Sequence, residues 1–105
     1  MKILAVTACP LGVAHTYMAA EMLSQVCDKL GIDCKVETQG AFGIENKITE
    51  EDVKTADAVI LTTDMPIKNV ERFDNIKKVM SSISLIVRET NELVETLVSE
   101  INEQK

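Results

Sequence analysis

The sequence predicts an α/β domain built on an open sheet of four parallel strands in the order 2-1-3-4, with helices on both faces. Three observations lead to this prediction. The chain has 105 residues, of which 46% are hydrophobic, as suits a single domain over residues 1–105. Two short apolar runs are typical of strands that are covered on both faces. Stretches with strand and helix patterns alternate, which favours right-handed crossovers between parallel strands.

The four expected strands differ in how clearly their patterns identify them. The first and third are continuous apolar runs, KILAVTA and DAVILTT. The second, DCKVET, alternates with Cys34 and Val36 on one face and Lys35 and Glu37 on the other, as in an edge strand. Two glycines indicate that QGAFGIEN, residues 39–46, is a loop. In chain order the expected strands are residues 2–8, 33–38, 57–63 and 77–82, the last with a weak pattern.

Three expected helices join and close this sheet. Apolar residues recur at helical spacing over residues 16–30, and Gly31 ends that helix. Thr49 is followed by acidic residues, which is typical of a short capped helix over residues 49–55. A long amphipathic helix with an acidic outer face closes the chain over residues 85–103. The whole arrangement is a flavodoxin-like or Rossmann-like three-layer fold.

Charge balance and cysteine pattern exclude several classes of function. With 11 Lys and Arg against 17 Asp and Glu, the chain has a net charge of -6 and lacks the basic surface that nucleic acids need. The odd number of cysteines argues against a disulfide framework, and Cys27 and Cys34 lie on expected core faces as packing residues. A single histidine, His15, supplies a metal site poorly, so we expect no metal and no cofactor.

The sequence shows no pattern of membrane insertion or export. No apolar run approaches the length of a transmembrane helix, and the first residues belong to an expected strand rather than to a cleavable signal. Free thiols suit a reducing compartment. We therefore expect a cytoplasmic protein.

The stretch VTACPLGVAHTYMAAE places Cys9 at the end of the first strand, just before a loop and a helix. In open parallel sheets, ligands bind beyond the carboxyl ends of the strands where the chain direction reverses, here between the first and third strands. Backbone N–H groups at a helix start bind anions, and they lower the pKa of a thiol from about 8.5 to about 7 or below. Cys9 is therefore the candidate nucleophile of a phosphate-binding loop. That loop consists of Pro10, Leu11, Gly12, Val13, Ala14, His15 and Thr16.

The spacing from Cys9 to His15 and Thr16, C-x5-H-T, resembles the C-x5-R-[ST] loop of tyrosine phosphatases, with histidine in place of arginine. An arginine grips phosphate with two hydrogen bonds and stabilises the transition state of hydrolysis. This loop offers backbone amides and one titratable ring instead. Such a loop is better suited to hold a phosphoryl group on the cysteine sulfur than to catalyse its hydrolysis.

Several motifs together resemble the IIB component of fructose-type sugar phosphotransferase systems. Members carry A-C-P-T-G-[IV]-A-H-T-[YF]-M-A-A-E, and this chain has ACPLGVAHTYMAAE. Leu11 stands where the family usually has a small residue, Thr or similar to Ser. VETQG, GIEN and ERF follow in order at residues 36–40, 43–46 and 71–73. The resemblance covers about residues 2–74 and is specific, because separated motifs agree as well as the loop.

This resemblance implies a phosphotransferase that works through a phosphocysteine. Cys9 would receive a phosphoryl group from a phosphohistidine of the IIA component and pass it to fructose or a related sugar held by the membrane IIC component. The implied partners are IIA, IIC and the sugar on IIC. Two alternatives stay open: a small cysteine-dependent phosphatase or arsenate-reductase-like enzyme, and a non-catalytic flavodoxin-like regulatory module.

Residues near the loop each have two interpretations. Gln39 and Gly40 end the second strand and either line the rim of the site or form a plain turn. Asp64 follows the third strand, where it either orients His15 or starts a turn. His15 itself either serves the loop or is merely exposed. Arg72 is expected to be solvated rather than to contact the phosphate of a partner.

Overall fold

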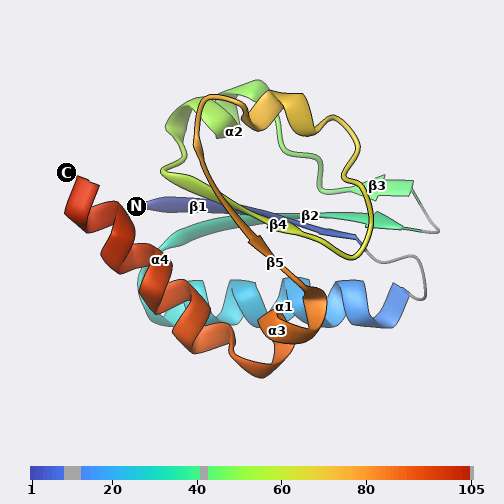
Figure 1. The fold of residues 1–105 in the computed structure, drawn as a ribbon, viewed down its shortest axis with the longest axis horizontal. Helices are drawn as coiled ribbons and strands as arrows, with labels where there is room; N and C mark the ends of the chain where they lie inside the picture. Colours follow the sequence, from blue (N-terminus) through green and yellow to red (C-terminus); the bar gives the residue numbers. More distant parts are fainter. Residues whose placement is uncertain (9–12, 41–42, 105) are drawn as a thin grey trace.

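The computed structural model describes residues 1–8, 13–40 and 43–104, which form a sheet between two layers of helices (Figure 1). The strands are β1 (Lys2–Ala8), β2 (Asp33–Gly40), β3 (Gly43–Glu45), β4 (Ala58–Thr62) and β5 (Lys77–Ser81). The helices are α1 (Val13–Lys29), α2 (Glu50–Thr55), α3 (Ile83–Arg88) and α4 (Thr90–Gln104), with a 3₁₀ helix, η1 (Val70–Phe73), after β4. Helices α1, α3 and α4 cover one face of the sheet, and α2 and η1 cover the other.

The sheet has five strands in the order β3-β2-β1-β4-β5, and all of them except β3 are parallel. The expectation of four strands in the order 2-1-3-4 is therefore wrong, because β3 adds an antiparallel strand at one edge. β3 was expected to be part of a loop, and β2 was expected to be the edge. A strand of three residues that begins with a glycine is too short to show an alternating pattern. The weakly patterned strand near the carboxyl end occurs as β5.

Two apolar cores hold the layers together, one on each face of the sheet. Alternate residues of β1 point to opposite faces, as expected of a central parallel strand. Ile3 packs in one cluster with Leu23 of α1 and Leu97 of α4. Leu4 packs in the other with Phe73 of η1. The buried strands thus place β1 in the middle of the sheet, with β2 and β4 as its neighbours.

Two helix boundaries differ from those expected. α1 begins at Val13, three residues before the expected start, so His15 and Thr16 lie in its first turn. The expectation of a single closing helix over residues 85–103 is wrong, because this part of the chain forms two helices, α3 and α4. Glu89 between them has a non-helical backbone (φ −131°, ψ 40°). No glycine or proline marks this break, so the helical spacing of apolar residues runs through it.

The short helix α2 forms as its sequence predicts. The Thr49 hydroxyl accepts the N–H of Asp52, whose carboxylate accepts the N–H of Thr49 in return. Lys35 and Lys2 approach the same carboxylate at 2.7 and 3.1 Å. The hydrogen bond from Lys35, followed by the Thr49 N–H, holds the pKa of Asp52 well below its usual value. α2 is therefore tied to the start of β1 and to β2.

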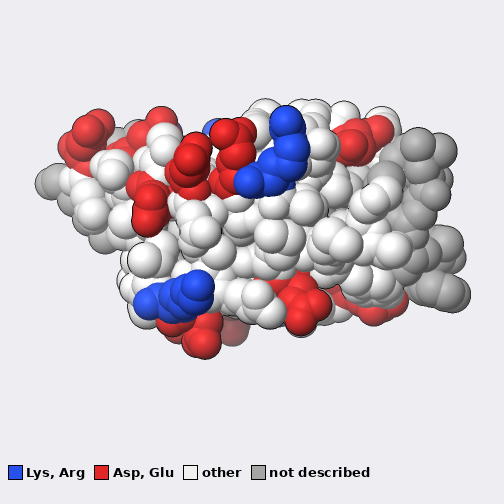
Figure 2. Space-filling model, turned by 90° about the horizontal axis from the view of Figure 1, so that it is seen from below, with Lys and Arg blue, Asp and Glu red and all other residues white. Residues whose placement is uncertain are grey.

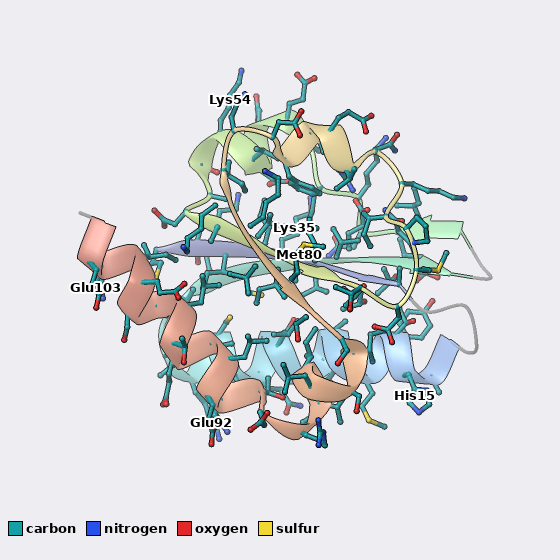
Figure 3. The ribbon with its side chains drawn as sticks, viewed as in Figure 1. His15, Lys35, Lys54, Met80, Glu92 and Glu103 are labelled. Carbon is teal, nitrogen blue, oxygen red and sulfur yellow. The ribbon has the colours of Figure 1, made fainter. Side chains whose placement is uncertain are left out.

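Acidic side chains outnumber basic ones on the face that α1, α3 and α4 cover, which Figure 2 shows. On α4, Glu92 and Glu103 project away from the sheet (Figure 3), as expected of an acidic outer face. Among the helices of the described residues, none combines the length and the apolar character that a membrane crossing requires.

Candidate functional site

The carboxyl ends of β1, β2 and β4 meet the start of α1 at one end of the molecule, on the right of Figure 1. Hydrogen bonds fix the end of β1 to β4 and to α1. The Ala8 N–H donates to Thr62 Oγ1 at 3.0 Å, and the Thr7 hydroxyl donates to the Thr16 carbonyl at 3.2 Å. The site residues that lie outside the described part of the chain are Cys9, Pro10, Leu11 and Gly12.

The described flanks locate the four-residue connection that contains Cys9. It leaves the sheet at Ala8 and enters α1 at Val13. The N–H groups of the first turn have no acceptor within the helix, and the aligned peptide dipoles make this end partly positive. Ala14 and His15 are exposed in this turn, and His15 projects outward at this end of the molecule (Figure 3). This end of α1 therefore favours an anion over a cation.

A buried ion pair lies beneath the ends of the strands. Glu37 of β2 has a fully buried side chain. Arg72 Nη1 donates to Glu37 Oε1 at 2.7 Å and to the Ile48 carbonyl at 2.9 Å, while Nη2 donates to Glu37 Oε2. The Ile48 N–H also donates to Glu37 Oε1, at 2.8 Å. Glu37 thus joins η1 to β2 and to the segment before α2.

Two opposing effects set the pKa of Glu37. Burial raises it, but the hydrogen bonds from Arg72, Gln39 and the Ile48 N–H outweigh burial and leave the pKa below its usual value. Glu37 is therefore a carboxylate at neutral pH, and it neutralises the Arg72 guanidinium.

The expectation that Arg72 is solvated is wrong. Its side chain is only 12% exposed, and its Nε is buried with no hydrogen-bond partner among the described residues. The reason is a tertiary contact with Glu37, which lies 35 positions earlier in the chain. Because both terminal nitrogens are bonded to Glu37, Arg72 does not supply the guanidinium that a phosphatase loop uses to grip phosphate.

Gln39 connects this ion pair to the chain that follows β4. Its Nε2 donates to Glu37 Oε2 at 2.7 Å and to the Lys68 carbonyl at 3.1 Å, and its Oε1 accepts the Lys68 N–H at 2.8 Å. Gln39 lies in β2, paired in register with Ala8, and is 2% exposed. Gly40, beside it, is exposed at the end of β2. The amide of Gln39 is therefore bonded within the protein, and a place for Gln39 and Gly40 on the rim of the site stays a prediction.

Asp64 and His15 line the same surface groove, beside the start of α1. The Asp64 Oδ1 accepts the Ile83 N–H at 2.8 Å and so supports the first turn of α3. The groove has a volume of about 460 Å³. Its lining residues are His15, Met18, Asp64, Ile83, Ser84, Val87 and Arg88. The structure thus brings Asp64 and His15 to one groove, and an orienting role for Asp64 stays a prediction.

A bridge between α1 and β3 was not expected from the sequence. The Tyr17 hydroxyl donates to a carboxylate oxygen of Glu45. This hydrogen bond is the main reason why the pKa of Tyr17 lies above its usual value. The sequence does hold a signal that could have predicted this contact. Both residues lie in motifs quoted for the family resemblance, HTYMAAE and GIEN, and Tyr17 directly follows the phosphate-binding loop. The bridge therefore links the start of α1 to the edge strand β3.

The other two cysteines pack in the core, as expected. Cys27 is 1% exposed and Cys34 is half-buried against the same cluster. A hydrogen bond to Cys27 and burial hold the pKa of Cys34 well above its usual value, so it is a protonated thiol at neutral pH. Among the described residues, no group of three His, Cys, Asp or Glu side chains is placed to hold a metal ion.

Comparison with known proteins identifies the family. Residues 4–96 match the family model described as the lactose/cellobiose-specific IIB subunit of the phosphotransferase system. A fructose-like EIIB component 2 of Escherichia coli K12 is 53% identical over 93 residues, 89% of this chain and 88% of that protein. A crystal structure of a domain from a fructose-specific IIABC component of Borrelia burgdorferi is 44% identical, with a TM-score of 0.85 over 90% of this chain and 89% of that one.

The fold is also similar to that of an arginine phosphatase, YwlE, with a TM-score of 0.51 over 100% of this chain and 98% of that one. At 15% identity this likeness concerns the fold alone. It shows that the α/β architecture by itself does not separate a carrier from a phosphatase. The family model and the much more similar EIIB relatives do separate them, and neither alternative function is favoured. The chain therefore belongs to the IIB family of sugar phosphotransferase systems and is a phosphocarrier of the fructose-like type.

Proposed function

We propose that Cys9 is the residue that carries the phosphoryl group, taking it from a phosphohistidine of a IIA component and passing it to fructose or a related sugar held by a membrane IIC component. Pro10, Leu11, Gly12 and Thr16 belong to the loop, and the backbone N–H groups from Leu11 to His15 surround the phosphate. His15 adds a donor when its ring faces the phosphate. The exchange takes place in the cytoplasm, where the thiol stays reduced.

Each transfer exchanges one bond to phosphorus for another. In the first, the Cys9 thiolate sulfur bonds to phosphorus as the bond from phosphorus to the donor histidine nitrogen breaks, and that electron pair stays on the imidazole. In the second, a sugar hydroxyl oxygen bonds to phosphorus, the sulfur–phosphorus bond breaks, and the hydroxyl proton goes to a base. Positioning by the docked partners and amide hydrogen bonds to the phosphoryl oxygens supply most of the catalysis.

One observation supports the proposal: the chain leaves β1 at Ala8 and enters a helix of 17 residues at Val13, so the four-residue connection that contains Cys9 joins a strand end to a partly positive helix terminus. A thiolate gains from that field, and so does the phosphate it takes up. Arg72 supports a carrier over a hydrolase, because its guanidinium is bonded to Glu37.

The test is intact-mass analysis after incubation with phosphoenolpyruvate, the general phosphotransferase proteins and the cognate IIA. We expect one added phosphoryl group in the wild type. Cys9→Ser should abolish the addition, while Cys27→Ser and Cys34→Ser, matched controls in the core, should keep it. An unchanged level of phosphorylation in Cys9→Ser would overturn the assignment of the carrier residue.

The two alternatives predict different outcomes. A phosphatase would release inorganic phosphate from a generic aryl phosphate without any partner protein. A regulatory module without catalysis would show no mass increase with any cognate donor and would work equally well as Cys9→Ser.

A further inference from the structure

The segment between β4 and η1, residues 63–69, crosses the carboxyl end of β1; we name it the crossing segment. It starts beside β5, where the Thr63 N–H donates to the Ser81 carbonyl at 3.0 Å. It reaches β2 at Lys68, which bonds Gln39. Because β1 lies between β4 and β2 in the sheet, the chain between these two contacts passes the end of β1 (Figure 1).

A buried side chain, Gln39, pins the far end of this crossing segment. It bonds both backbone groups of Lys68, the N–H at 2.8 Å and the carbonyl at 3.1 Å. It is in turn held by Glu37, which Arg72 anchors from the far side. Both polar atoms of the Gln39 amide are hydrogen-bonded, so this side chain fixes the backbone of Lys68 at one position.

Gln39, which holds this backbone, is paired with the residue that precedes the nucleophile. Gln39 and Ala8 are opposite one another in the β1–β2 register, and Cys9 is the next residue after Ala8. The crossing segment and the start of α1 therefore both lie at the end of β1, after which Cys9 follows in the sequence. Amide hydrogen bonds to a transferred phosphoryl group depend on backbone placement within fractions of an ångström.

We propose that Gln39 is a positioning residue for phosphoryl transfer: through the backbone of Lys68 it holds the crossing segment in place at the end of β1, the strand that Cys9 follows. The role rests on the proposed function of Cys9. It requires the side-chain amide of Gln39 and the backbone of Lys68, but not the Lys68 side chain.

Three variants test this role. Gln39→Met keeps the length of the side chain but removes its hydrogen bonds. Lys68→Ala keeps both backbone groups that Gln39 binds and is the matched control. Val94→Ala removes buried volume in the opposite part of the fold, on α4, and controls for a general loss of stability.

The first measurement is the rate of phosphoryl transfer from phosphorylated IIA at varied IIA concentration. Gln39→Met should lower the maximal rate about tenfold or more with little change in half-saturation, because the reacting atoms are misplaced after docking. Lys68→Ala and Val94→Ala should keep the wild-type maximal rate. A wild-type rate in Gln39→Met, or an equal loss in Val94→Ala, would overturn the positioning role.

The second measurement is the rate of Cys9 alkylation by iodoacetamide at neutral pH, followed by peptide mass analysis and made without any phosphoryl donor. Gln39→Met should change this rate about threefold or more, because the amides that stabilise the thiolate are no longer held in place. Lys68→Ala should match the wild type. An unchanged rate in Gln39→Met contradicts the role of Gln39, whereas a wild type that alkylates normally and accepts no phosphate contradicts the proposed function.

Discussion

Replacing Arg72 with methionine separates the charge of the buried pair from its packing. Methionine keeps an unbranched apolar chain in the same space. Among the described residues, it leaves the Glu37 carboxylate with the Gln39 amide and the Ile48 N–H as donors. The variant loses two hydrogen bonds to Glu37 and one to the Ile48 carbonyl. The chain then contains an uncompensated negative charge at a position that is fully buried.

The expected cost follows from that burial. Removing one partner of a buried ion pair costs about 3–5 kcal/mol, whereas replacing both partners with apolar residues of similar volume is often close to neutral. We therefore expect Arg72→Met to lower the free energy of unfolding by about 3–5 kcal/mol at pH 7. The double variant Glu37→Leu/Arg72→Met should recover most of that loss.

The stability lost in Arg72→Met should depend on pH, and the direction of that dependence follows from the pKa of Glu37. In the wild type the pKa of Glu37 is lowered, so its contribution to stability is present above the unfolded pKa of about 4.3 and is lost as pH falls through the folded value. Without Arg72, burial dominates and raises the pKa, so the variant loses stability as pH rises through that higher value. The difference between the two proteins should therefore be largest near neutral pH and shrink as pH falls toward 4.

Urea unfolding followed by far-ultraviolet circular dichroism measures these differences between pH 4 and 8. A loss below about 1 kcal/mol that is constant across this range would refute the account, because it is what an exposed ion pair gives. A double variant no more stable than Arg72→Met would refute it as well, since the penalty would then come from packing rather than from charge.

Other substitutions test the cap, the acid response and the α1–β3 bridge. Thr49→Ala should cost about 1 kcal/mol in urea unfolding through loss of the α2 cap, and an unchanged midpoint would contradict the capping role. Asp52→Asn should weaken the acid sensitivity of the fold below about pH 4, since the lowered pKa of Asp52 contributes stability that protonation removes; an identical acid transition would argue against this. Glu45→Gln should bring the pKa of Tyr17, the single tyrosine, down toward about 10 in an alkaline absorbance titration, and an unshifted curve would exclude the bridge in solution.

Local patterns predicted those parts of the fold whose physical cause is local. The apolar runs of β1 and β4 reflect burial on both faces of the sheet. The Thr49 cap of α2 depends on residues that are close together in the sequence. The break at Glu89 was missed because no residue there is a strong helix breaker. β3 was missed because three residues with a glycine at one end show no alternation.

The tertiary parts of the site were harder to predict. The pattern of β2 placed Glu37 on a polar face, and it is in fact fully buried. Neither Glu37 nor Arg72 reveals its partner locally, because the two lie on different elements and meet only when η1 packs on the sheet. The position of Cys9 after a central strand was predictable, since strand order alone determines where a parallel sheet opens toward ligands.

Following the fate of the phosphoryl group on the isolated phosphoprotein tests the central claim most directly. The protein is labelled with radioactive phosphate through IIA, purified, and divided between buffer alone and membranes that contain the cognate IIC with fructose. A carrier with Cys9 as acceptor should keep its label in buffer, show it on the Cys9 peptide, and lose it to sugar phosphate when IIC and sugar are present. Rapid release of inorganic phosphate in buffer alone, or a label on any other residue, would contradict the account.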